Sequence, residues 1–308
     1  MEIEEIKKLE KCEICPRRCK VNRLKGEKGF CNLGTEVKVA LVSSHDFEEP
    51  CISGASQDTK SSGTVFFSNC NLRCVFCQNH EISAEGKGKI ITVERLAEIF
   101  IEQQERNVNN INLVTPTMYV YQIIEAIKIA REKGLHIPII YNSNGYENVE
   151  TIKALNGYIN VYLPDLKYYA DELAEKYSSA PHYFEIATKA IKEMYNQVGS
   201  PVFDESGIIQ SGVIIRHLIL PNHVQNTKRI LKWIKENMPK DIYVSVMAQY
   251  FPTYKAKNIE NINRKIKIKE YREVENYLYA LDLENGYMQD LGKHEEEYVP
   301  KFDFRGVE

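Results

Sequence analysis

The sequence lacks any long apolar run. No stretch of about eighteen consecutive apolar residues occurs, so the sequence predicts no membrane span. Residues 1–11 alternate acidic and basic side chains and lack the apolar core of a signal peptide, which predicts a cytoplasmic protein. The net charge is −3 and there is no basic tract, so nothing in the composition predicts binding to nucleic acid.

Against these absences, the chain is rich enough in apolar residues to build a full core. It has 308 residues, of which 43% are hydrophobic and 27% charged, the proportions of an ordinary globular protein. A chain of this length fits a single α/β barrel. It also contains eight cysteines. In a cytoplasmic chain, cysteines indicate metal binding or catalysis rather than disulfides.

Three of the cysteines stand at the spacing C-x3-C-x2-C, directly after the apolar run at residues 64–67. They are Cys70, Cys74 and Cys77, in a segment that we call the cysteine loop (residues 68–79). Thiolates are the usual ligands of iron–sulfur clusters. Three of them hold three irons of a four-iron cluster and leave the fourth iron free to bind another ligand. The alternative is a structural zinc site, for which His80 would supply the fourth ligand.

A second cysteine group lies near the start of the chain, in the N-terminal module (residues 12–31). Cys12, Cys15, Cys19 and Cys31 have the spacing C-x2-C-x3-C-x11-C. Four thiolates in so short a segment suit structural zinc or a second four-iron cluster, and the spacing leaves both open, with four free thiols as the third alternative. A module of this size buries little apolar surface, so a metal would supply its folding energy.

The remaining pattern alternates strands with helices. Strands are expected at 36–42, 63–67, 110–114, 138–141, 158–163, 212–220 and 241–248. Helices are expected at 1–11, 93–102, 119–132, 149–155, 171–177, 182–195, 225–238 and 269–283. The segment 43–54 is expected to be a polar loop, and the tail from residue 284 has no clear period. Six strands alternating with helices after a lead-in strand predict an α/β fold with a parallel sheet.

The cysteine spacing, with the aromatic Phe76 just before the last cysteine, resembles the signature of the radical S-adenosylmethionine (radical SAM) enzymes. The resemblance extends from Thr64 to about Lys255 and is strongest to proteins related to pyruvate formate-lyase activating enzyme. It implies a partial (βα)6 TIM-type barrel with its active site at the carboxyl ends of the strands. It also implies a 4Fe-4S cluster and S-adenosylmethionine (SAM) as cofactors. The expected domains are 1–60, with the cysteine-rich extension, 61–258, the partial barrel, and 259–308, a C-terminal helix and tail.

The resemblance assigns roles to residues that follow the expected strands. Many radical SAM enzymes carry Gly-Gly-Glu after the second barrel strand, where it receives the amino group of SAM. This chain has Thr115 and Thr117 there, whose hydroxyls accept the same hydrogen bond more weakly than a carboxylate. The alternative for Thr117 is an N-cap of the following helix.

In the resembled activating enzymes, an Asp and a Thr after strand three and an Asp after strand four bind a monovalent cation beside the carboxylate of SAM. Asn142, Ser143 and Asp165 take these places, with one negative charge fewer, so a cation would bind less tightly. Lys167 is expected near the carboxylate of SAM, with an exposed ion pair as the alternative. Arg216, on strand five, is expected to face the cavity and bind a carboxylate bidentately.

Other positions are weaker candidates. The resembled family has a Glu-Glu-Pro segment just before the first barrel strand, as this chain has at residues 48–50, so the loop is expected to line the cavity without an assigned role. The weaker candidates, each with packing or surface exposure as the alternative, are His45, Cys51, His217, His223, Gln249, Tyr250 and Tyr254. Phe251 stands where pyruvate formate-lyase activating enzyme has a histidine.

The leading functional hypothesis is a radical SAM enzyme that cleaves SAM reductively and abstracts a hydrogen atom, in the manner of an activase for a glycyl radical enzyme. The resemblance implies a protein partner and a one-electron donor such as flavodoxin or ferredoxin. The alternative is radical modification of another protein, a peptide or a small molecule. A hypothesis of another class is a non-catalytic zinc-binding scaffold protein with two thiolate sites.

Overall fold

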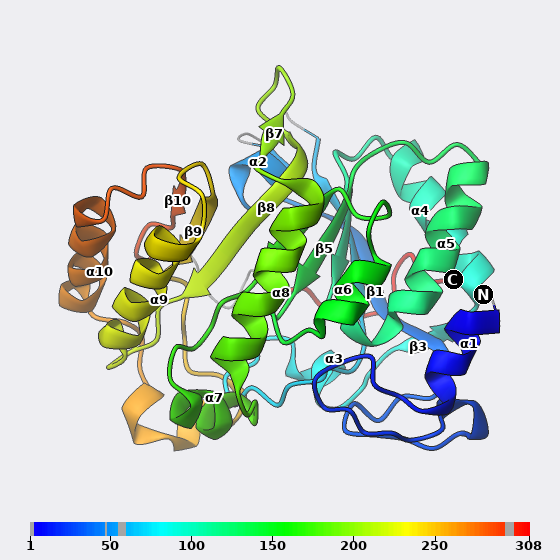
Figure 1. The fold of residues 1–308 in the computed structure, drawn as a ribbon, viewed down its shortest axis with the longest axis horizontal. Coiled ribbons are helices and arrows are strands. Elements are labelled where there is room, and N and C mark those ends of the chain that lie inside the picture. The colour runs from blue at the N-terminus through cyan, green and yellow to red at the C-terminus, as the bar shows by residue number, and fades with distance from the viewer. Residues whose placement is uncertain (1–2, 47, 55–59, 293–298) are drawn as a thin grey trace.

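The computed structural model describes residues 3–46, 48–54, 60–292 and 299–308. The other positions lie outside the described residues: 1–2 in the expected first helix, Phe47 in the expected loop, 55–59, and 293–298 in the expected tail. The described residues form an α/β structure around one twisted sheet (Figure 1). None of the helices in these ranges combines the length and the apolar character needed to cross a membrane.

The sheet has the strand order β10-β9-β8-β6-β5-β4-β2-β1-β3 within the described residues. The strands are β1 (Val37–His45), β2 (Ser62–Phe67), β3 (Lys89–Ile91), β4 (Ile111–Val114), β5 (Ile139–Ser143), β6 (Val161–Pro164), β7 (Val202–Phe203), β8 (Ile209–Leu218), β9 (Tyr243–Met247) and β10 (Gly286–Met288). Neighbours from β2 to β10 are parallel, whereas β1 pairs antiparallel with β2 and with β3. The sheet stays open between its edges β3 and β10, which confirms the predicted partial barrel.

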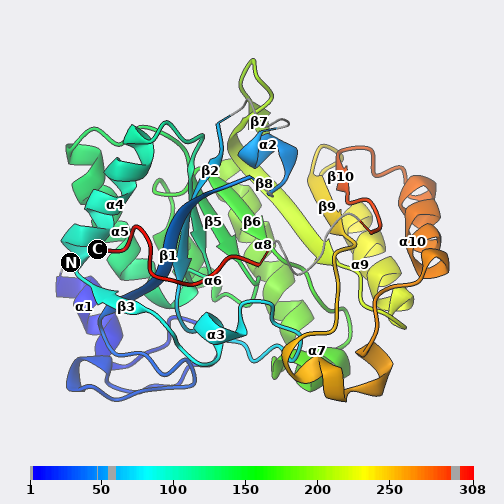
Figure 2. The ribbon, with the colours of Figure 1, turned by 180° about the vertical axis from the view of Figure 1, so that it is seen from behind.

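Helices connect the parallel strands. They are α1 (Ile3–Glu10), α2 (Pro50–Ser53), α3 (His80–Ser83), α4 (Val93–Glu105), α5 (Val120–Glu132), α6 (Val149–Ala154), α7 (Asp171–Ser178), α8 (Tyr183–Val198), α9 (Val224–Asn237) and α10 (Ile268–Ala280). Figure 1 shows α4, α5, α6, α8 and α9 on one face of the sheet. On the opposite face, seen in Figure 2, the C-terminal segment passes in front of the strand β1. Right-handed crossovers place such helices on one side of a curved parallel sheet.

Local sequence signals account for the element boundaries. The Thr92 side chain accepts a hydrogen bond from Arg95 N at 3.1 Å and so caps α4, as an N-cap threonine does. Gly134 follows α5 with φ +98°, a left-handed conformation that glycine adopts without steric cost. The core lies between the helices and the sheet, and it contains fully buried apolar residues from the long helices α4, α5, α8 and α9. Examples, one from each of these helices, are Phe100, Ile123, Ile191 and Ile230.

At the periphery of the sheet one expectation is wrong, and the structure of the tail, for which the sequence shows no clear period, is now defined. The segment 43–54 is not a continuous loop, because β1 continues to His45 and α2 follows. The C-terminal tail is built into the sheet: β10 pairs with β9, and the backbone N–H of Phe304 donates to Ala40 O at 3.2 Å. The strand β10 was not predicted because three residues are too few to show a period. The contact of Phe304 with Ala40 was not predicted because hydrogen bonds between backbone groups some 260 residues apart in sequence leave no local pattern.

Candidate active site

The cysteine loop hangs from the carboxyl end of β2, where the barrel architecture places active sites. Its backbone is fixed from the side by the end of α7. Arg73 N donates to Ser178 O at 3.0 Å, and Val75 N donates to Tyr177 O at 2.8 Å. The loop therefore has a defined position between the first barrel strand and the connection after the fourth.

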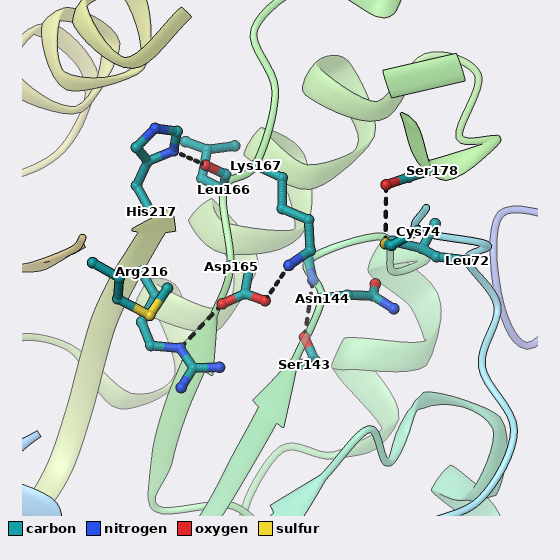
Figure 3. A network of polar contacts seen from close by, with 12 residues as sticks. Leu72, Cys74, Ser143, Asn144, Asp165, Leu166, Lys167, Ser178, Arg216 and His217 are labelled. Carbon is teal, nitrogen blue, oxygen red and sulfur yellow. Dashed lines mark hydrogen bonds and ion pairs between the residues drawn. The ribbon is translucent and has the colours of Figure 1, made fainter. Parts of the chain in front are cut away.

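The three cysteines of this loop are free thiols, with Cys70 buried and Cys74 and Cys77 half-buried. Each sulfur atom has hydrogen-bond partners. These are Leu72 N at 3.3 Å and Asn144 Nδ2 at 3.4 Å for Cys70, Ser178 Oγ at 2.9 Å for Cys74, and Ser83 Oγ at 3.2 Å for Cys77. Figure 3 shows the contact between Ser178 and Cys74. Hydrogen bonds to the sulfurs are a means by which proteins orient and tune cluster ligands.

The thiols interact electrostatically with one another. Burial, reinforced by the neighbouring Cys74, raises the pKa of Cys70 to about 12 and that of Cys77 to about 11. Burial also raises the pKa of Cys74. These groups therefore hold their protons at neutral pH until a metal displaces them.

In the described residues, no three His, Cys, Asp or Glu side chains are placed to hold a single metal ion. The ligands of a four-iron cluster bind separate irons and need not converge on one point, so the three buried thiols fit a cluster. The zinc alternative needs His80 as its fourth ligand. His80 instead contacts Glu85 through Nδ1 at 2.9 Å and stacks on Tyr254 with ring centroids 4.6 Å apart.

Beside the loop lies a cavity of about 260 Å³, which we call the cysteine-lined cavity. The structure gathers most of the predicted site residues on its wall. These are Cys74, Phe76, Cys77, Asn142, Asp165, Lys167 and Arg216. His45, Glu48, Gln249 and Tyr250 also line it, together with Phe251. The barrel thus brings residues from the ends of five strands to one space.

A buried ionic network occupies one wall of this cavity. Asp165 lies between Lys167 Nζ at 2.6 Å and Arg216 Nε at 3.0 Å (Figure 3). Burial opposes the charged form of Asp165, but the two cations outweigh it and hold its pKa below the ordinary value. The Lys167 side chain is only 17% exposed. The alternative of an exposed ion pair for Lys167 is therefore wrong.

Arg216 has two further acceptors. One terminal nitrogen donates to Asn142 Oδ1 at 2.6 Å, and the other contacts Glu48 Oε2 at 3.4 Å. Asn112 Nδ2 donates to the second oxygen of Glu48 at 3.2 Å. No role was predicted for Glu48. Its partners Asn112 and Arg216 lie on β4 and β8, far from it in sequence, so no local pattern indicates these contacts. The Asn142 and Asp165 oxygens expected to bind a monovalent cation are hydrogen-bonded to protein cations instead.

Four predicted site residues do not line the cavity: Cys70, Thr115, Thr117 and Ser143. Thr117 is fully buried and its Oγ1 donates to Glu147 Oε1 at 2.6 Å. The N-cap alternative for Thr117 is also wrong, since Pro116 precedes the helical turn. The Ser143 hydroxyl accepts from Gly145 N at 3.2 Å. Thr115 has φ +61°, an outlying conformation for a β-branched residue, which is typical of strained positions beside functional sites.

Three of the weaker candidates, His217, His223 and Cys51, are packing residues. His217 is fully buried, contacts Leu166 O at 2.7 Å and Thr227 Oγ1 at 2.9 Å, and burial lowers its pKa to about 4 (Figure 3). His223 contacts the Tyr177 hydroxyl at 3.0 Å. Cys51 is 2% exposed and lies in a small apolar cluster. These side chains hold elements in place rather than face the cavity.

The four cysteines of the N-terminal module surround a space of about 10 Å³, roughly the room of one water molecule. Burial raises the pKa of Cys15 to about 12 and also raises the pKa of Cys31. Position 29 has no room for a side chain, because a Cβ atom there would lie 2.8 Å from the Cys19 sulfur. Like the other described groups, these four thiols are not placed to hold a single metal ion.

The N-terminal module also contacts the cysteine loop, which the sequence did not reveal. Arg17 Nε donates to Asn71 O at 2.9 Å, and Asn69 Nδ2 donates to Cys31 O at 2.9 Å. The Arg73 guanidinium lies 4.3 Å from the centroid of the Phe30 ring. The module therefore buttresses the loop that carries the other three cysteines.

The family follows from comparison with known proteins. The profile of the radical SAM superfamily matches residues 64–209, beginning at β2 and including the cysteine loop. The chain belongs to the radical SAM superfamily. As a radical SAM protein it is an enzyme whose family uses a 4Fe-4S cluster and SAM, which excludes the alternative of a non-catalytic zinc scaffold.

Relatives of this radical SAM protein include the uncharacterized protein MJ0674 of Methanocaldococcus jannaschii. The two are 34% identical over 290 residues, which cover 91% of this chain and 76% of the relative. The pyruvate formate-lyase-activating enzyme of Clostridium pasteurianum is 26% identical over 113 residues, covering 35% of this chain and 46% of that enzyme. The match to a named activating enzyme is thus partial.

Among solved structures, the FeFe-hydrogenase maturase HydG from Carboxydothermus hydrogenoformans is similar with a TM-score of 0.50 and 12% sequence identity. The alignment covers 75% of this chain and 54% of that one. The chain therefore spans about half the length of this solved structure. At this level of identity the likeness shows the shared partial barrel and nothing about substrates.

Proposed function

We propose that this radical SAM enzyme cleaves SAM reductively and abstracts a hydrogen atom from a glycine of a partner glycyl radical enzyme. The main observation in support of radical chemistry is that two of the loop cysteines and a buried ionic network line one cavity. Cys74 and Cys77 line the same space as the buried Asp165–Lys167–Arg216 network. The partial similarity to the pyruvate formate-lyase-activating enzyme of Clostridium pasteurianum supports the glycine target.

In this proposal Cys70, Cys74 and Cys77 each bind one iron through a thiolate. A four-iron cluster held by these residues would supply the electron for reductive cleavage of SAM. The loop contributes rigidity, because its sulfurs and its backbone are hydrogen-bonded to α3, α7 and the end of β5. Such support keeps the three ligands in place when the metal enters.

Lys167 and Arg216 supply the positive charge that would bind the carboxylate of SAM. Asp165 contacts both cations at hydrogen-bond distance and so fixes their orientation. Each guanidinium nitrogen of Arg216 already has a protein acceptor, so Arg216 would have to exchange one of these contacts to bind the carboxylate. Phe76 packs edge-on against Tyr250, with ring centroids 5.7 Å apart, and both rings line the cavity.

For the N-terminal module we propose a structural metal site formed by Cys12, Cys15, Cys19 and Cys31. The spacing of these cysteines leaves zinc and a second four-iron cluster both open. A protein electron donor, flavodoxin or ferredoxin, would reduce the cluster from the surface. Metal analysis of the full chain, with zinc and iron counted per protein, tests the assignment.

Reductive cleavage is tested on the anaerobically reconstituted full chain. With dithionite and SAM, we expect formation of 5′-deoxyadenosine, measured by chromatography, and a change in the electron paramagnetic resonance spectrum of the cluster on addition of SAM. The matched control omits dithionite. A protein that binds four irons at the loop but forms no 5′-deoxyadenosine would contradict the proposed reaction.

The target is tested separately by adding a glycyl radical enzyme from the same organism. We expect the doublet signal of a glycyl radical, and its loss when the acceptor glycine is replaced by alanine. A second candidate is the radical modification of another protein, a peptide or a small molecule. The observation in its favour is that the similarity to the activating enzyme covers only 35% of this chain, so most of the chain has no match to that enzyme. Formation of 5′-deoxyadenosine without a partner radical would support this second candidate.

A further inference from the structure

A second cavity adjoins the cysteine-lined cavity. It measures about 540 Å³ and shares part of its wall with the first cavity. The shared residues are Glu48, Arg216, Met247 and Gln249. We call it the acidic cavity. Under the proposed function, a substrate held there would lie next to SAM, so this inference rests on that function and concerns its substrate.

The acidic cavity has more negative than positive charge on its wall. The acidic side chains are Asp46, Glu48, Glu49 and Asp290. Among the described lining residues Arg216 is the one cation, and each of its guanidinium nitrogens already has an acceptor at 2.6–3.4 Å. Arg216 therefore balances at most part of the charge of the four carboxyl groups on this wall. Burial raises the pKa of Glu48 and of Glu49, so a further cation beside them would favour their charged forms.

Glu49 is the residue that points to a missing ligand. Its side chain lines the acidic cavity and the residue is only 8% exposed, yet its Oε2 atom has no hydrogen-bond partner. A buried carboxylate oxygen without a donor costs free energy, on the order of 1–3 kcal/mol. Buried polar atoms nearly always find partners, and an exception at the wall of a cavity indicates a donor that binds there.

The rest of the wall favours a particular shape of ligand. Met247, Met288 and Tyr287 give the cavity a partly apolar surface. Methionine side chains adapt to irregular apolar groups, and methylene chains pack well on them. Gln289 is held by Gln249 at 3.1 Å and accepts from Ala248 N at 2.9 Å, so this side of the wall is fixed.

We propose that the acidic cavity binds the cationic end of the substrate, an alkylammonium or guanidinium group on a methylene stem. Glu49 accepts the hydrogen bond from the cation, and the methionines contact the stem. A lysine or arginine side chain of a protein and a free diamine share this chemistry. Because the two cavities share a wall, the methylene stem would lie next to the cysteine-lined cavity.

The first test compares probes that differ only in charge, on the reconstituted full chain with SAM present. The probes are Nα-acetyl-lysine methylamide, its uncharged norleucine analogue, and 1,4-diaminobutane. By calorimetry we expect the lysine probe or the diamine to bind at least about tenfold more tightly than the norleucine analogue. The tighter of the two cations identifies a protein side chain or a small molecule as the substrate. Equal binding of charged and uncharged probes would overturn the inference.

The second test changes the proposed acceptor. Glu49→Gln keeps the size of the side chain and removes its charge, so the dissociation constant of the preferred cation should rise at least about tenfold. The matched control is Glu150→Gln, the same change on the surface of α6, where the side chain is 82% exposed. This control should bind the probes as the wild type does. The wild-type comparison of probes stands even if Glu49→Gln does not fold.

The two proposals fail in different ways. Probe binding is measured without turnover, so a protein that binds the cation but forms no 5′-deoxyadenosine contradicts only the proposed reaction. A protein that cleaves SAM but shows no preference for charge contradicts only the acidic cavity as a cation site. Unchanged cation binding in Glu49→Gln would likewise remove Glu49 from this role.

Discussion

The two cysteine groups of the molecule are both buried, yet their surroundings differ. The cysteine loop borders a cavity of about 260 Å³ that holds Asp165, Lys167 and Arg216. The N-terminal module surrounds a space of about 10 Å³ with no room for a substrate. Open metal sites with a free position carry out chemistry, and closed four-ligand sites hold structure together. The comparison therefore supports the proposal that one group serves catalysis and the other stability.

The largest effect is expected in the cysteine loop. Cys74→Ala removes one iron ligand, so formation of 5′-deoxyadenosine should fall at least about a hundredfold and the iron content should fall with it. The control is Cys51→Ala, which changes a buried cysteine outside both groups and should keep the iron. Retained SAM cleavage in Cys74→Ala would remove this cysteine from the site and break the comparison.

In the N-terminal module the same kind of change should act on stability. Cys15→Ser should release the metal of the module and lower the thermal midpoint by at least about 5 °C, since each kcal/mol shifts that of a large domain by about 2–4 °C. Activity per folded molecule should fall far less than in Cys74→Ala. Metal analysis and thermal unfolding check this, and an unchanged metal content would favour four free thiols.

A change in the ionic network tests whether the cysteine-lined cavity binds SAM. Asp165→Asn leaves Lys167 and Arg216 without their shared carboxylate, and breaking such a buried network costs about 3–5 kcal/mol. The dissociation constant for SAM should rise at least about tenfold, measured by calorimetry on reconstituted protein. Glu150→Gln breaks an exposed ion pair with Lys153 and should change neither stability nor SAM binding noticeably. Unaltered SAM affinity in Asp165→Asn would exclude this residue from the SAM site.

The smallest effect is expected where the two groups meet. Arg17→Ala removes the hydrogen bond to Asn71 O and a guanidinium 3.8 Å from the Phe30 ring centroid, at a cost of about 1–2 kcal/mol. SAM cleavage should change by no more than a few-fold. Denaturant unfolding measures the cost, with Arg106→Ala, at an exposed position after α4, as the control. A loss of SAM cleavage as deep as that of Cys74→Ala would show that the module is part of the catalytic site.

Much of the fold was predictable because it depends on local signals. The apolar runs of the strands, the Thr92 cap and the Gly134 stop placed the main elements within a few residues. The parallel order followed from alternation of strands and helices. The last strand was missed because β10 has three half-buried residues, which carry no pattern of their own.

The candidate site was predictable to the extent that it follows strand ends. Phe76, Asn142, Asp165, Lys167 and Arg216 reach one cavity, as the resemblance implied. Thr117 and Ser143 were expected there as well, but their hydroxyls are bonded to Glu147 and to Gly145 N. Which way a side chain turns at the end of a strand depends on neighbours that are distant in sequence.

By itself, the sequence determined the chemistry of the protein: the spacing of Cys70, Cys74 and Cys77 within one loop, and the strands and helices that carry it. These are properties of short segments, and short segments keep their spacing in any fold. Only the tertiary structure decided how the N-terminal module buttresses the loop, how Glu48 joins Arg216, and how Glu49 faces a second cavity. Those contacts join residues far apart along the chain, so they exist only once the sheet has brought its strand ends together.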